Sequence, residues 1–252
     1  MNKSITEIRA EFERAGSDEL AELYCRYEAD ERKGVMALIK KYQKQEQMLK
    51  DETKRVEKLC AYEKEYAKYQ HICGIDEVGR GPLAGPVVAG AVILPKDCRI
   101  LYIDDSKKLS AQKRESLYDE IMTEAVSVGI GIVSPARIDE INILNATYEA
   151  MRDAVSQLGV RPDILLNDAV TIPGIEIRQI PIIKGDAKSI SIAAASIVAK
   201  VTRDRLMEEY DKILPDYSFA SNKGYGAPIH IDALKKVGPS PIHRKSFIKN
   251  LI

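Results

Sequence analysis

The sequence predicts an α/β fold with a mixed β-sheet, preceded by a segment of helices. Two changes of pattern along the chain support this prediction. The first 70 residues contain no proline and place apolar residues at helical spacing among many charged ones. From residue 71, short apolar runs of strand type follow one another closely and later alternate with helical patterns. The close series favours an antiparallel meander, and the alternation favours parallel βα units in the same sheet.

The individual elements can be placed from their cap and turn residues. Ser4 and Glu7 have capping-box spacing, which favours a helical hairpin or small bundle whose last helix runs toward Gln70. Pro135 suits a first helical turn, and Pro215 ends a long helix. Strands are expected over residues 71–76, 86–94, 99–103, 126–134, 163–168 and 175–183. Helices are expected over residues 111–125, 143–158, 189–214 and 228–236.

The charged residues are balanced overall but not along the chain. The 252 residues include 38 Lys and Arg and 38 Asp and Glu, so the formal net charge is zero. Residues 71–183 have 16 acidic and 11 basic side chains, whereas residues 184–252 have 7 acidic and 12 basic ones. A local basic excess is how a nucleic-acid-binding surface appears in a protein of neutral total charge. A nucleic-acid partner is therefore compatible with this composition.

The cysteines, histidines and apolar segments argue against several classes of protein. The four cysteines follow no spacing typical of a zinc site or a disulfide framework. No apolar stretch resembles a signal sequence or is long enough to span a membrane. We therefore expect a reduced, cytoplasmic protein without a membrane partner. His71, His230 and His243 are scattered along the chain, and we assign no catalytic role to them.

The most informative segment is residues 74–86, in which an apolar run ends in two adjacent carboxylates. Asp76 and Glu77 are followed by Gly79-Arg80-Gly81. Carboxylates beside an apolar core need a compensating charge, and hard divalent cations such as Mg²⁺ prefer oxygen ligands. The planar guanidinium of Arg80 suits phosphate, and the glycines allow close approach of the backbone. A solvated turn would explain the segment equally well unless it has partners elsewhere in the chain.

Two further acids supply such partners. Asp168 ends an apolar run, and Asp186 comes just before the small-residue helix that begins near Ser189. Each alone is explained by a turn or a helix cap, but four acids at one sheet edge would repel one another without cations. Such a cluster suits a two-metal site for phosphoryl displacement. Since adjacent strand residues face opposite sides, we expect the strand to break or bulge at residues 76–78.

Together these segments resemble the bacterial ribonuclease HII family. The resemblance covers about residues 71–247 and depends on five separated motifs in the family's order. The motifs are residues 74–88, Asp105-Ser106-Lys107-Lys108-Leu109, Asp168, residues 184–188 and Asn222-Lys223-Gly224-Tyr225-Gly226. The resemblance implies a ribonuclease H-like fold with a five-stranded mixed sheet. It also divides the chain into a helical extension, residues 1–70, and a catalytic domain, residues 71–252, with a helical and basic tail.

The resemblance implies an activity and a set of site residues. The family cleaves the RNA strand of RNA–DNA hybrids, and DNA duplexes at single ribonucleotides, leaving 5′-phosphate and 3′-hydroxyl ends. Asp76, Glu77, Asp168 and Asp186 match its catalytic, metal-binding acids, which use two Mg²⁺ or Mn²⁺ ions. Asp76 is expected to bridge them. Gly79-Arg80-Gly81 matches the segment that contacts the ribonucleotide. Tyr225 matches the tyrosine that packs on the following deoxyribose.

Further polar residues are candidates for substrate contact. Ser106 belongs to the second motif, and four lysines near the motifs could contact phosphates: Lys107, Lys108, Lys184 and Lys188. Each lysine is equally well explained as an ordinary surface residue. We expect a monomer, and the sequence identifies no protein partner.

Two positions depart from the family pattern, and two other functions compete. Asn167 stands where an apolar residue is expected, and Ala227-Pro228 stands where a threonine is usual.

One alternative function is that of the related ribonuclease HIII, which shares the acids but resembles Gly-[Ser/Thr]-Gly at the position of Arg80. The other is a nucleic-acid-binding module without catalysis. Four intact acids argue against that module, since they would weaken DNA binding in the absence of metal ions.

Overall fold

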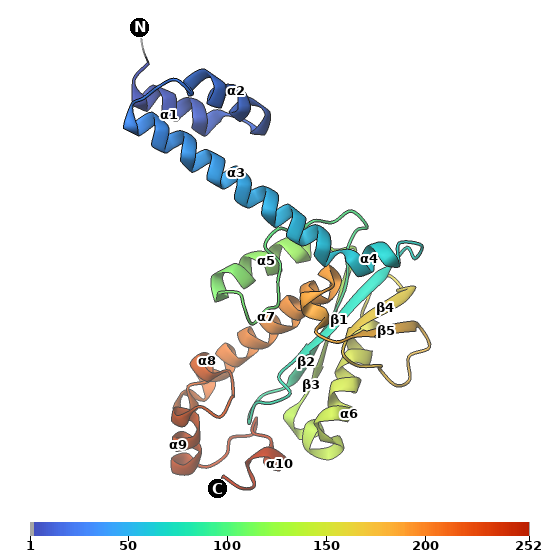
Figure 1. Ribbon diagram of the computed structural model, residues 1–252. Coiled ribbons are helices and arrows are strands. Elements are labelled where there is room, and N and C mark those ends of the chain that lie inside the picture. Colours follow the sequence, from blue (N-terminus) through green and yellow to red (C-terminus); the bar gives the residue numbers. More distant parts are fainter. Residues whose placement is uncertain (1–2, 252) are drawn as a thin grey trace. The chain divides into compact units, whose positions relative to one another are not determined.

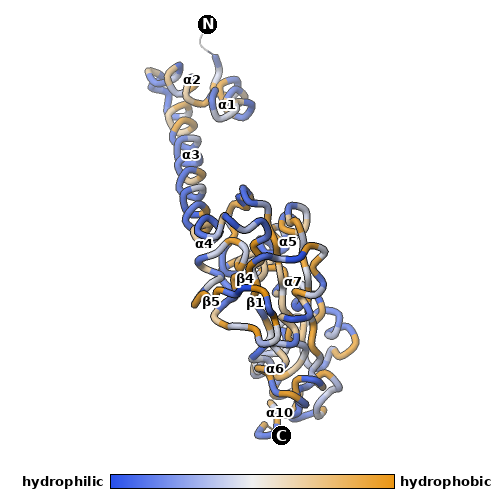
Figure 2. Tube along the Cα trace, turned by 90° about the vertical axis from the view of Figure 1, so that its right-hand side faces the viewer, coloured by the Kyte–Doolittle hydropathy of each residue, from blue (hydrophilic) through white to orange (hydrophobic). Residues whose placement is uncertain are grey.

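The computed structural model describes residues 3–251, which form two compact units, one up to Arg55 and one from Val56 onward. The first unit contains α1 (Ile5–Arg14), α2 (Ser17–Tyr27) and most of α3 (Lys33–Leu59). The predicted capping box at Ser4 is present. These helices enclose an apolar core of their own that includes Ile8, Phe12 and Val35. Figure 2 shows hydrophilic residues along much of α3.

The second unit is built on one five-stranded mixed sheet (Figure 1). Its strands are β1 (Ile72–Val78), β2 (Val87–Ile93), β3 (Ser127–Val133), β4 (Ile164–Asp168) and β5 (Arg178–Ile182), in the order β3-β2-β1-β4-β5. β1, β2 and β3 pair antiparallel, whereas β4 pairs parallel with both β1 and β5. This arrangement confirms the predicted meander followed by parallel βα units.

Helices and short helical turns complete this unit. After the end of α3 they are α4 (Ala61–Glu65), α5 (Ala111–Glu124), α6 (Pro135–Ser156), η1 (Gly185–Ala187), α7 (Ile190–Ile213), η2 (Pro215–Tyr217), α8 (Phe219–Asn222), α9 (Pro228–Val237) and α10 (Lys245–Ile248). In α6, the non-helical backbone of Asn142 separates the first turns at Pro135 from the segment predicted over 143–158.

The sheet is covered by α6 on one face and α7 on the other (Figure 1). Glycines let α7 lie very close to the strands. A Cβ atom on Gly74 would lie 2.0 Å from the backbone carbon of Ser191, and one on Gly90 would lie 2.6 Å from the oxygen of Ala195. Residues of β1 that share the side of Gly74 therefore face α7, whereas Cys73 and Ile75 belong to the core on the α6 side.

Two predictions about the strands were wrong. Residues 99–103 form no strand, because the chain leaves the sheet after β2 and Tyr102 has a left-handed φ of 66°. Ile100 and Ile103 are apolar because they pack into the core shared with α5 and α7. The expected break at residues 76–78 is also absent. β1 keeps regular register with β2 as far as Val78, which pairs with Val88.

Within residues 3–251, no helix is both long enough and apolar enough to cross a bilayer.

Candidate active site

The acids predicted from the sequence lie at the ends of adjacent elements of the second unit. Asp76 lies in β1, Asp168 is the last residue of β4, and Asp186 lies in η1, directly before α7. Ile75 pairs with Asn167 in the parallel ladder, so Asp76 and Asp168 follow at the same level of neighbouring strands. The backbone N–H of Gly185 donates to Asp168 Oδ1 at 2.7 Å, which joins η1 to the end of β4. These contacts bring three of the acids to one end of the sheet.

The electrostatic interactions show that these carboxylates affect one another. Burial raises the pKa of Asp76 well above its usual value, and the charges of Glu77 and Asp168 raise it further. Burial also raises the pKa of Asp186, with added repulsion from Asp105 and Asp168. Both groups would hold their charge more easily beside a cation. The acids therefore form an electrostatically coupled cluster, to which Asp105 contributes as well.

Glu77 occupies a different position from Asp76 because β1 remains regular. Burial raises the pKa of Glu77, while the guanidinium of Arg80 lowers it and Asp168 raises it. Arg80 Nη1 lies 3.2 Å from Glu77 Oε1. The other carboxylate oxygen, Oε2, is buried and has no hydrogen-bond partner. Thus one carboxylate oxygen of Glu77 accepts a hydrogen bond from Arg80, and the other is available for a further ligand.

The donor atoms of this cluster suit a hard divalent cation. Every candidate ligand is a carboxylate oxygen, their mutual repulsion favours a positive charge among them, and Glu77 Oε2 lacks a partner. Among residues 3–251, however, no three His, Cys, Asp or Glu side chains stand in a ready-made group of metal ligands. The chemistry of the residues fits a Mg²⁺ or Mn²⁺ ion, whereas their side-chain positions do not yet form a coordination shell.

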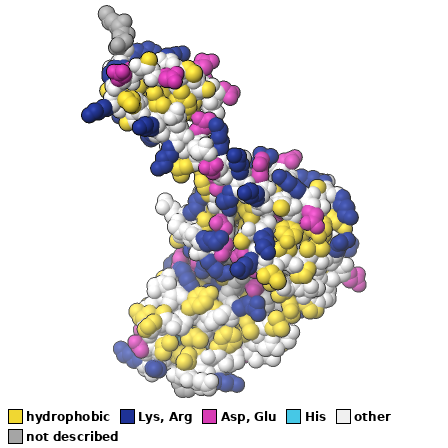
Figure 3. All heavy atoms as spheres, in the orientation of Figure 1, with side chains coloured by type: hydrophobic (Ala, Val, Ile, Leu, Met, Phe, Trp, Pro, Cys, Tyr) yellow, Lys and Arg dark blue, Asp and Glu magenta, His cyan; other side chains and the backbone are white. Residues whose placement is uncertain are grey.

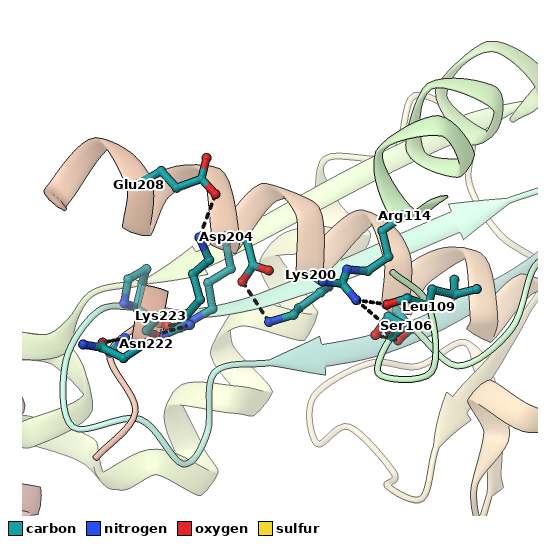
Figure 4. Close-up of polar contacts among 12 residues, drawn as sticks. Ser106, Leu109, Arg114, Lys200, Asp204, Glu208, Asn222 and Lys223 are labelled. Carbon is teal, nitrogen blue, oxygen red and sulfur yellow. Dashed lines mark hydrogen bonds and ion pairs between the residues drawn. The ribbon is translucent and has the colours of Figure 1, made fainter. Parts of the chain in front are cut away.

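The segment after Asp105 approaches the same cluster. Burial lowers the pKa of Lys107, yet the nearby Asp105 and three acids of the cluster raise it above its usual value. The hydroxyls of Ser106 and Ser196 lie 2.7 Å apart, which ties this segment to α7. Arg114 Nη1 donates to the carbonyl oxygens of Ser106 and Leu109 (Figure 4). Lys107 is therefore the lysine that the structure places in the field of the acids.

The other candidate lysines are positioned differently. Lys108 Nζ forms an ion pair with Asp104 at 3.1 Å, and its side chain is largely exposed. Lys184 and Lys188 are exposed on either side of Asp186. Figure 3 shows Lys and Arg side chains close to Asp and Glu side chains on one face of the second unit. Within this unit the predicted phosphate-contacting lysines are available at the surface rather than bound to the acids.

The glycine–arginine segment after β1 is held by two arginines that sequence reasoning missed. Gly79 has a φ of +90°, and a Cβ atom there would lie 2.3 Å from Arg203 Nε. Arg203 donates to the carbonyl oxygens of Pro86, Ala84 and Lys223 at 2.9–3.1 Å. Helical spacing indicates only that residue 203 is buried, because it lies one turn after the buried Ala199 on α7. It does not indicate which groups Arg203 binds.

Arg244 holds the same segment from the C-terminal side. Its guanidinium donates to the carbonyl oxygens of Gly79, Arg80 and Gly85 at 2.5–3.0 Å. Arg203 and Arg244 are both fully buried. Burial, and then the charge of Arg203, lower the pKa of Arg244 to about 9. No sequence spacing indicates these contacts, because the acceptors are backbone oxygens about 160 residues away along the chain.

Tyr225 lies beside this segment. The residue is 44% exposed, and a Cβ atom on Gly81 would lie 3.8 Å from its Cε1 atom. The N–H of Leu83 donates to the oxygen of Gly224 at 2.8 Å, which joins the two motifs. The neighbouring Lys223 forms an ion pair with Glu208 of α7 at 2.6 Å (Figure 4). The structure thus brings Gly81 and Tyr225 together.

The unusual Asn167 acts on the other side of the sheet. Its side-chain amide donates to the oxygen of Val170 at 3.1 Å and to Gln179 Oε1 at 2.8 Å. Gln179 in turn binds the backbone of Ile172 through both of its polar atoms. Asn167 therefore orders the loop after β4, while the adjacent Asp168 faces the acids. The second departure, Ala227-Pro228, begins α9, with Pro228 in its first turn.

Comparison with known proteins identifies relatives along the whole chain. The family model "Ribonuclease HII" matches residues 73–250, and the model "Ribonuclease HII N-terminal domain" matches residues 4–67. A ribonuclease HII of Lachnoclostridium phytofermentans is 66% identical over 251 residues, covering 100% of this chain and 99% of the relative. A ribonuclease HII of Clostridioides difficile is 52% identical, with 100% and 99% covered.

Solved structures share the fold of the second unit. The crystal structure of ribonuclease H2 from Pyrococcus horikoshii matches with 28% identity and a TM-score of 0.61, covering 72% of this chain and 96% of that one. The RNase HII of Archaeoglobus fulgidus, solved in complex with PCNA, matches with 29% identity and a TM-score of 0.59, covering 69% and 93%. Both comparisons support the predicted ribonuclease H-like architecture.

Proposed function

This chain belongs to the ribonuclease HII family, and on that premise we propose that it is a metal-dependent endoribonuclease. Its substrates are RNA–DNA hybrids and DNA duplexes that contain single ribonucleotides, and its products have 5′-phosphate and 3′-hydroxyl ends. The observation that carries this proposal is the coupled acid cluster of β1, β4 and η1 beside the Gly79–Gly81 segment. Removal of ribonucleotides from DNA is the repair reaction that such an activity would begin.

The acids have the first role in the proposed reaction. Asp76, Glu77, Asp168 and Asp186 would hold two Mg²⁺ or Mn²⁺ ions, with Asp76 between them. When bound, these ions activate the attacking water and stabilise the leaving 3′ oxygen. The unpartnered Oε2 of Glu77 and the raised pKa of Asp76 support this assignment. Lys107 lies in the field of the acids and would bind a phosphate of the cleaved strand.

The Gly79–Gly81 segment and Tyr225 would select the substrate. Arg244 binds the carbonyl oxygens of Gly79 and Arg80, and Arg203 binds those of Ala84 and Pro86 in the loop that follows. These contacts would hold the segment in place for the nucleic acid. A 2′-hydroxyl is the group that marks a ribonucleotide among deoxyribonucleotides. The exposed ring of Tyr225 would pack on the next sugar, where a second 2′-hydroxyl would disturb the contact. This arrangement favours an RNA–DNA junction over continuous RNA.

One cleavage assay distinguishes the proposed function from its alternatives. The substrate is a DNA duplex with one embedded ribonucleotide, labelled at either end and incubated with Mg²⁺ or Mn²⁺. Cleavage on the 5′ side of the ribonucleotide is expected. Cleavage of longer RNA tracts alone would instead indicate a ribonuclease HIII-like activity, and binding without cleavage would indicate a non-catalytic module. Arg80→Ser serves as the matched variant, since serine stands there in the ribonuclease HIII pattern.

The organisation of the chain is part of the same proposal. We assign the catalytic domain to residues 71–252 and treat residues 1–70 as a helical extension. We further propose that the protein acts as a monomer in the cytoplasm. Deleting residues 1–70 and measuring substrate affinity tests whether the extension contributes to binding. Size-exclusion chromatography with light scattering tests the monomer.

A further inference from the structure

A continuous chain of hydrogen bonds lies behind Tyr225 and involves two histidines for which the proposed reaction has no role. His230 Nδ1 lies 2.8 Å from the carbonyl oxygen of Tyr225, and His230 Nε2 lies 2.9 Å from His243 Nε2. His243 Nδ1 lies 2.9 Å from the backbone nitrogen of Ser240 and 2.8 Å from its hydroxyl oxygen. Both imidazole rings are buried.

Only one arrangement of protons satisfies every bond in this chain. The Tyr225 carbonyl can only accept, so His230 Nδ1 donates to it and Nε2 of the neutral ring accepts. His243 Nε2 must then donate to His230, which leaves His243 Nδ1 to accept from the N–H and hydroxyl of Ser240. We call Ser240, His243 and His230 in this arrangement the histidine relay. Each member fixes the orientation of the next.

The surroundings hold the relay rigidly in place. The His230 ring packs edge-on against Phe219 at 5.2 Å between centroids, and the His243 ring packs against Tyr217 at 4.8 Å. The hydroxyl of Tyr217 donates to the oxygen of Gly238 at 2.7 Å. Such contacts leave the two imidazoles little freedom to change rotamer. The relay is therefore a preorganised support rather than a mobile surface group.

The relay ends at Tyr225, whose side chain is partly exposed. The Tyr225 carbonyl also accepts from the N–H of Ala227 at 2.8 Å, so His230 fixes the same oxygen from a second direction. Tyr225 is 44% exposed, and its ring is the part of the residue beside Gly81. With its backbone fixed from two sides, the ring keeps its place beside the Gly79–Gly81 segment.

We propose that the histidine relay positions Tyr225 for its contact with the sugar that follows the ribonucleotide. The inference rests on the proposed function, because it assigns a purpose to that contact. Ser240, His243 and His230 touch neither the substrate nor the acids; they act through Tyr225 and are positioning residues. Their loss changes the selection of RNA–DNA junctions before it changes the cleavage step shared by all substrates.

Two variants of His230 separate the hydrogen bond from the shape of the ring. His230→Phe keeps an aromatic ring against Phe219 but removes both nitrogen contacts. His230→Asn keeps an N–H donor close to the position of Nδ1. We expect His230→Phe to lower kcat for a single embedded ribonucleotide by roughly tenfold or more, as misplacement of a substrate-positioning group does. Cleavage of continuous RNA in a hybrid should change much less, and His230→Asn should retain most of the wild-type preference.

A double-variant cycle with Tyr225→Ala tests whether the relay acts through Tyr225. If it does, His230→Phe adds nothing to the loss of selectivity that Tyr225→Ala already causes. Equal loss on both substrates, or an additive effect in the double variant, would overturn the proposal. Thermal unfolding of each variant shows whether a general loss of stability accounts for the change.

A nuclear magnetic resonance measurement tests the relay without any cleavage. The chain has three histidines, so the imidazole nitrogen resonances of ¹⁵N-histidine-labelled protein can be assigned from the variants. At neutral pH, His230 is expected to be protonated at Nδ1 and His243 at Nε2. The ring resonances of Tyr225 should shift in His230→Phe but not in His230→Asn. The opposite tautomers, or an unchanged Tyr225 ring, would refute the relay, whereas an inactive wild type would refute only the proposed function.

Discussion

Acidification should destabilise this protein through its two buried histidines. His230 and His243 share one proton between their Nε2 atoms at 2.9 Å, so a second proton there would break the contact. Burial lowers the pKa of His230. Burial, and then the neighbouring His230, lower the pKa of His243 from 6.5 to about 4. Both rings are therefore neutral in the folded protein at pH values where they would be protonated in the unfolded chain.

The sign and size of the effect follow from this difference. Between pH 6.5 and about 4 the unfolded chain binds more protons than the folded one, so the free energy of unfolding decreases as the pH falls. The contribution is complete above pH 6.5 and lost near pH 4. The pKa of His243 falls from 6.5 to about 4 on folding. Because each pKa unit corresponds to about 1.4 kcal/mol, this fall contributes about 3 kcal/mol to the free energy of unfolding. His230 contributes in the same direction.

The assay is urea-induced unfolding of the metal-free protein at several pH values between 4 and 7. The control is the double variant His230→Asn/His243→Asn, whose amides keep the contacts to Tyr225 and Ser240 but do not titrate. The acids with raised pKa values act in the opposite direction, and they are present in both proteins. The wild type should lose at least about 3 kcal/mol relative to the variant between pH 6.5 and 4, because His230 adds to the contribution of His243. Parallel pH profiles in the two proteins would refute this reasoning.

Three other perturbations test the candidate site. Asp76→Asn should abolish cleavage without lowering the stability of the metal-free protein, because it relieves repulsion from Glu77 and Asp168; retained Mg²⁺-dependent activity would contradict the metal assignment. Mn²⁺ at a hundred times its dissociation constant should stabilise the wild type by about 3 kcal/mol in thermal unfolding, and a chelator should remove this stabilisation. The stability of Asp76→Asn should change little when Mn²⁺ is added. Arg244→Lys should lower stability by roughly 2 kcal/mol and raise KM, since a compact ammonium lacks the spread of Nε, Nη1 and Nη2 with which Arg244 reaches three carbonyl oxygens. Wild-type unfolding and KM in that variant would show that the guanidinium is dispensable.

The sheet topology could be predicted because it depends on local patterns. Short apolar runs, turn residues and helix caps are visible in the sequence, and they predicted the antiparallel meander followed by parallel strands that the sheet contains. The error at residues 99–103 has the same source. Ile100 and Ile103 are apolar because they pack beneath helices, and an apolar run under a helix resembles a strand in sequence.

The error at residues 76–78 arose from an assumption about the acids. The predicted break would let both Asp76 and Glu77 face the same metal site. In a regular strand, two adjacent side chains point to opposite faces of the sheet. The structure keeps the strand regular, and Glu77 instead interacts with Arg80 while retaining one unpartnered oxygen. Sequence motifs therefore identified which groups carry charge, but the direction of each side chain depended on backbone pairing with β2.

The contacts that hold residues 79–86 and Tyr225 could not be predicted, because the arginines and the histidine bind backbone atoms. Arg203, Arg244 and His230 bind carbonyl oxygens, and any residue at the accepting position offers the same oxygen. Covering a buried guanidinium with carbonyl oxygens avoids a carboxylate near the acid cluster, where a further negative charge would add to the repulsion. Arg203 and Arg244 of the C-terminal segment thus bind backbone oxygens within residues 79–86. A net charge counted from the sequence cannot distinguish this role from a nucleic-acid-binding surface.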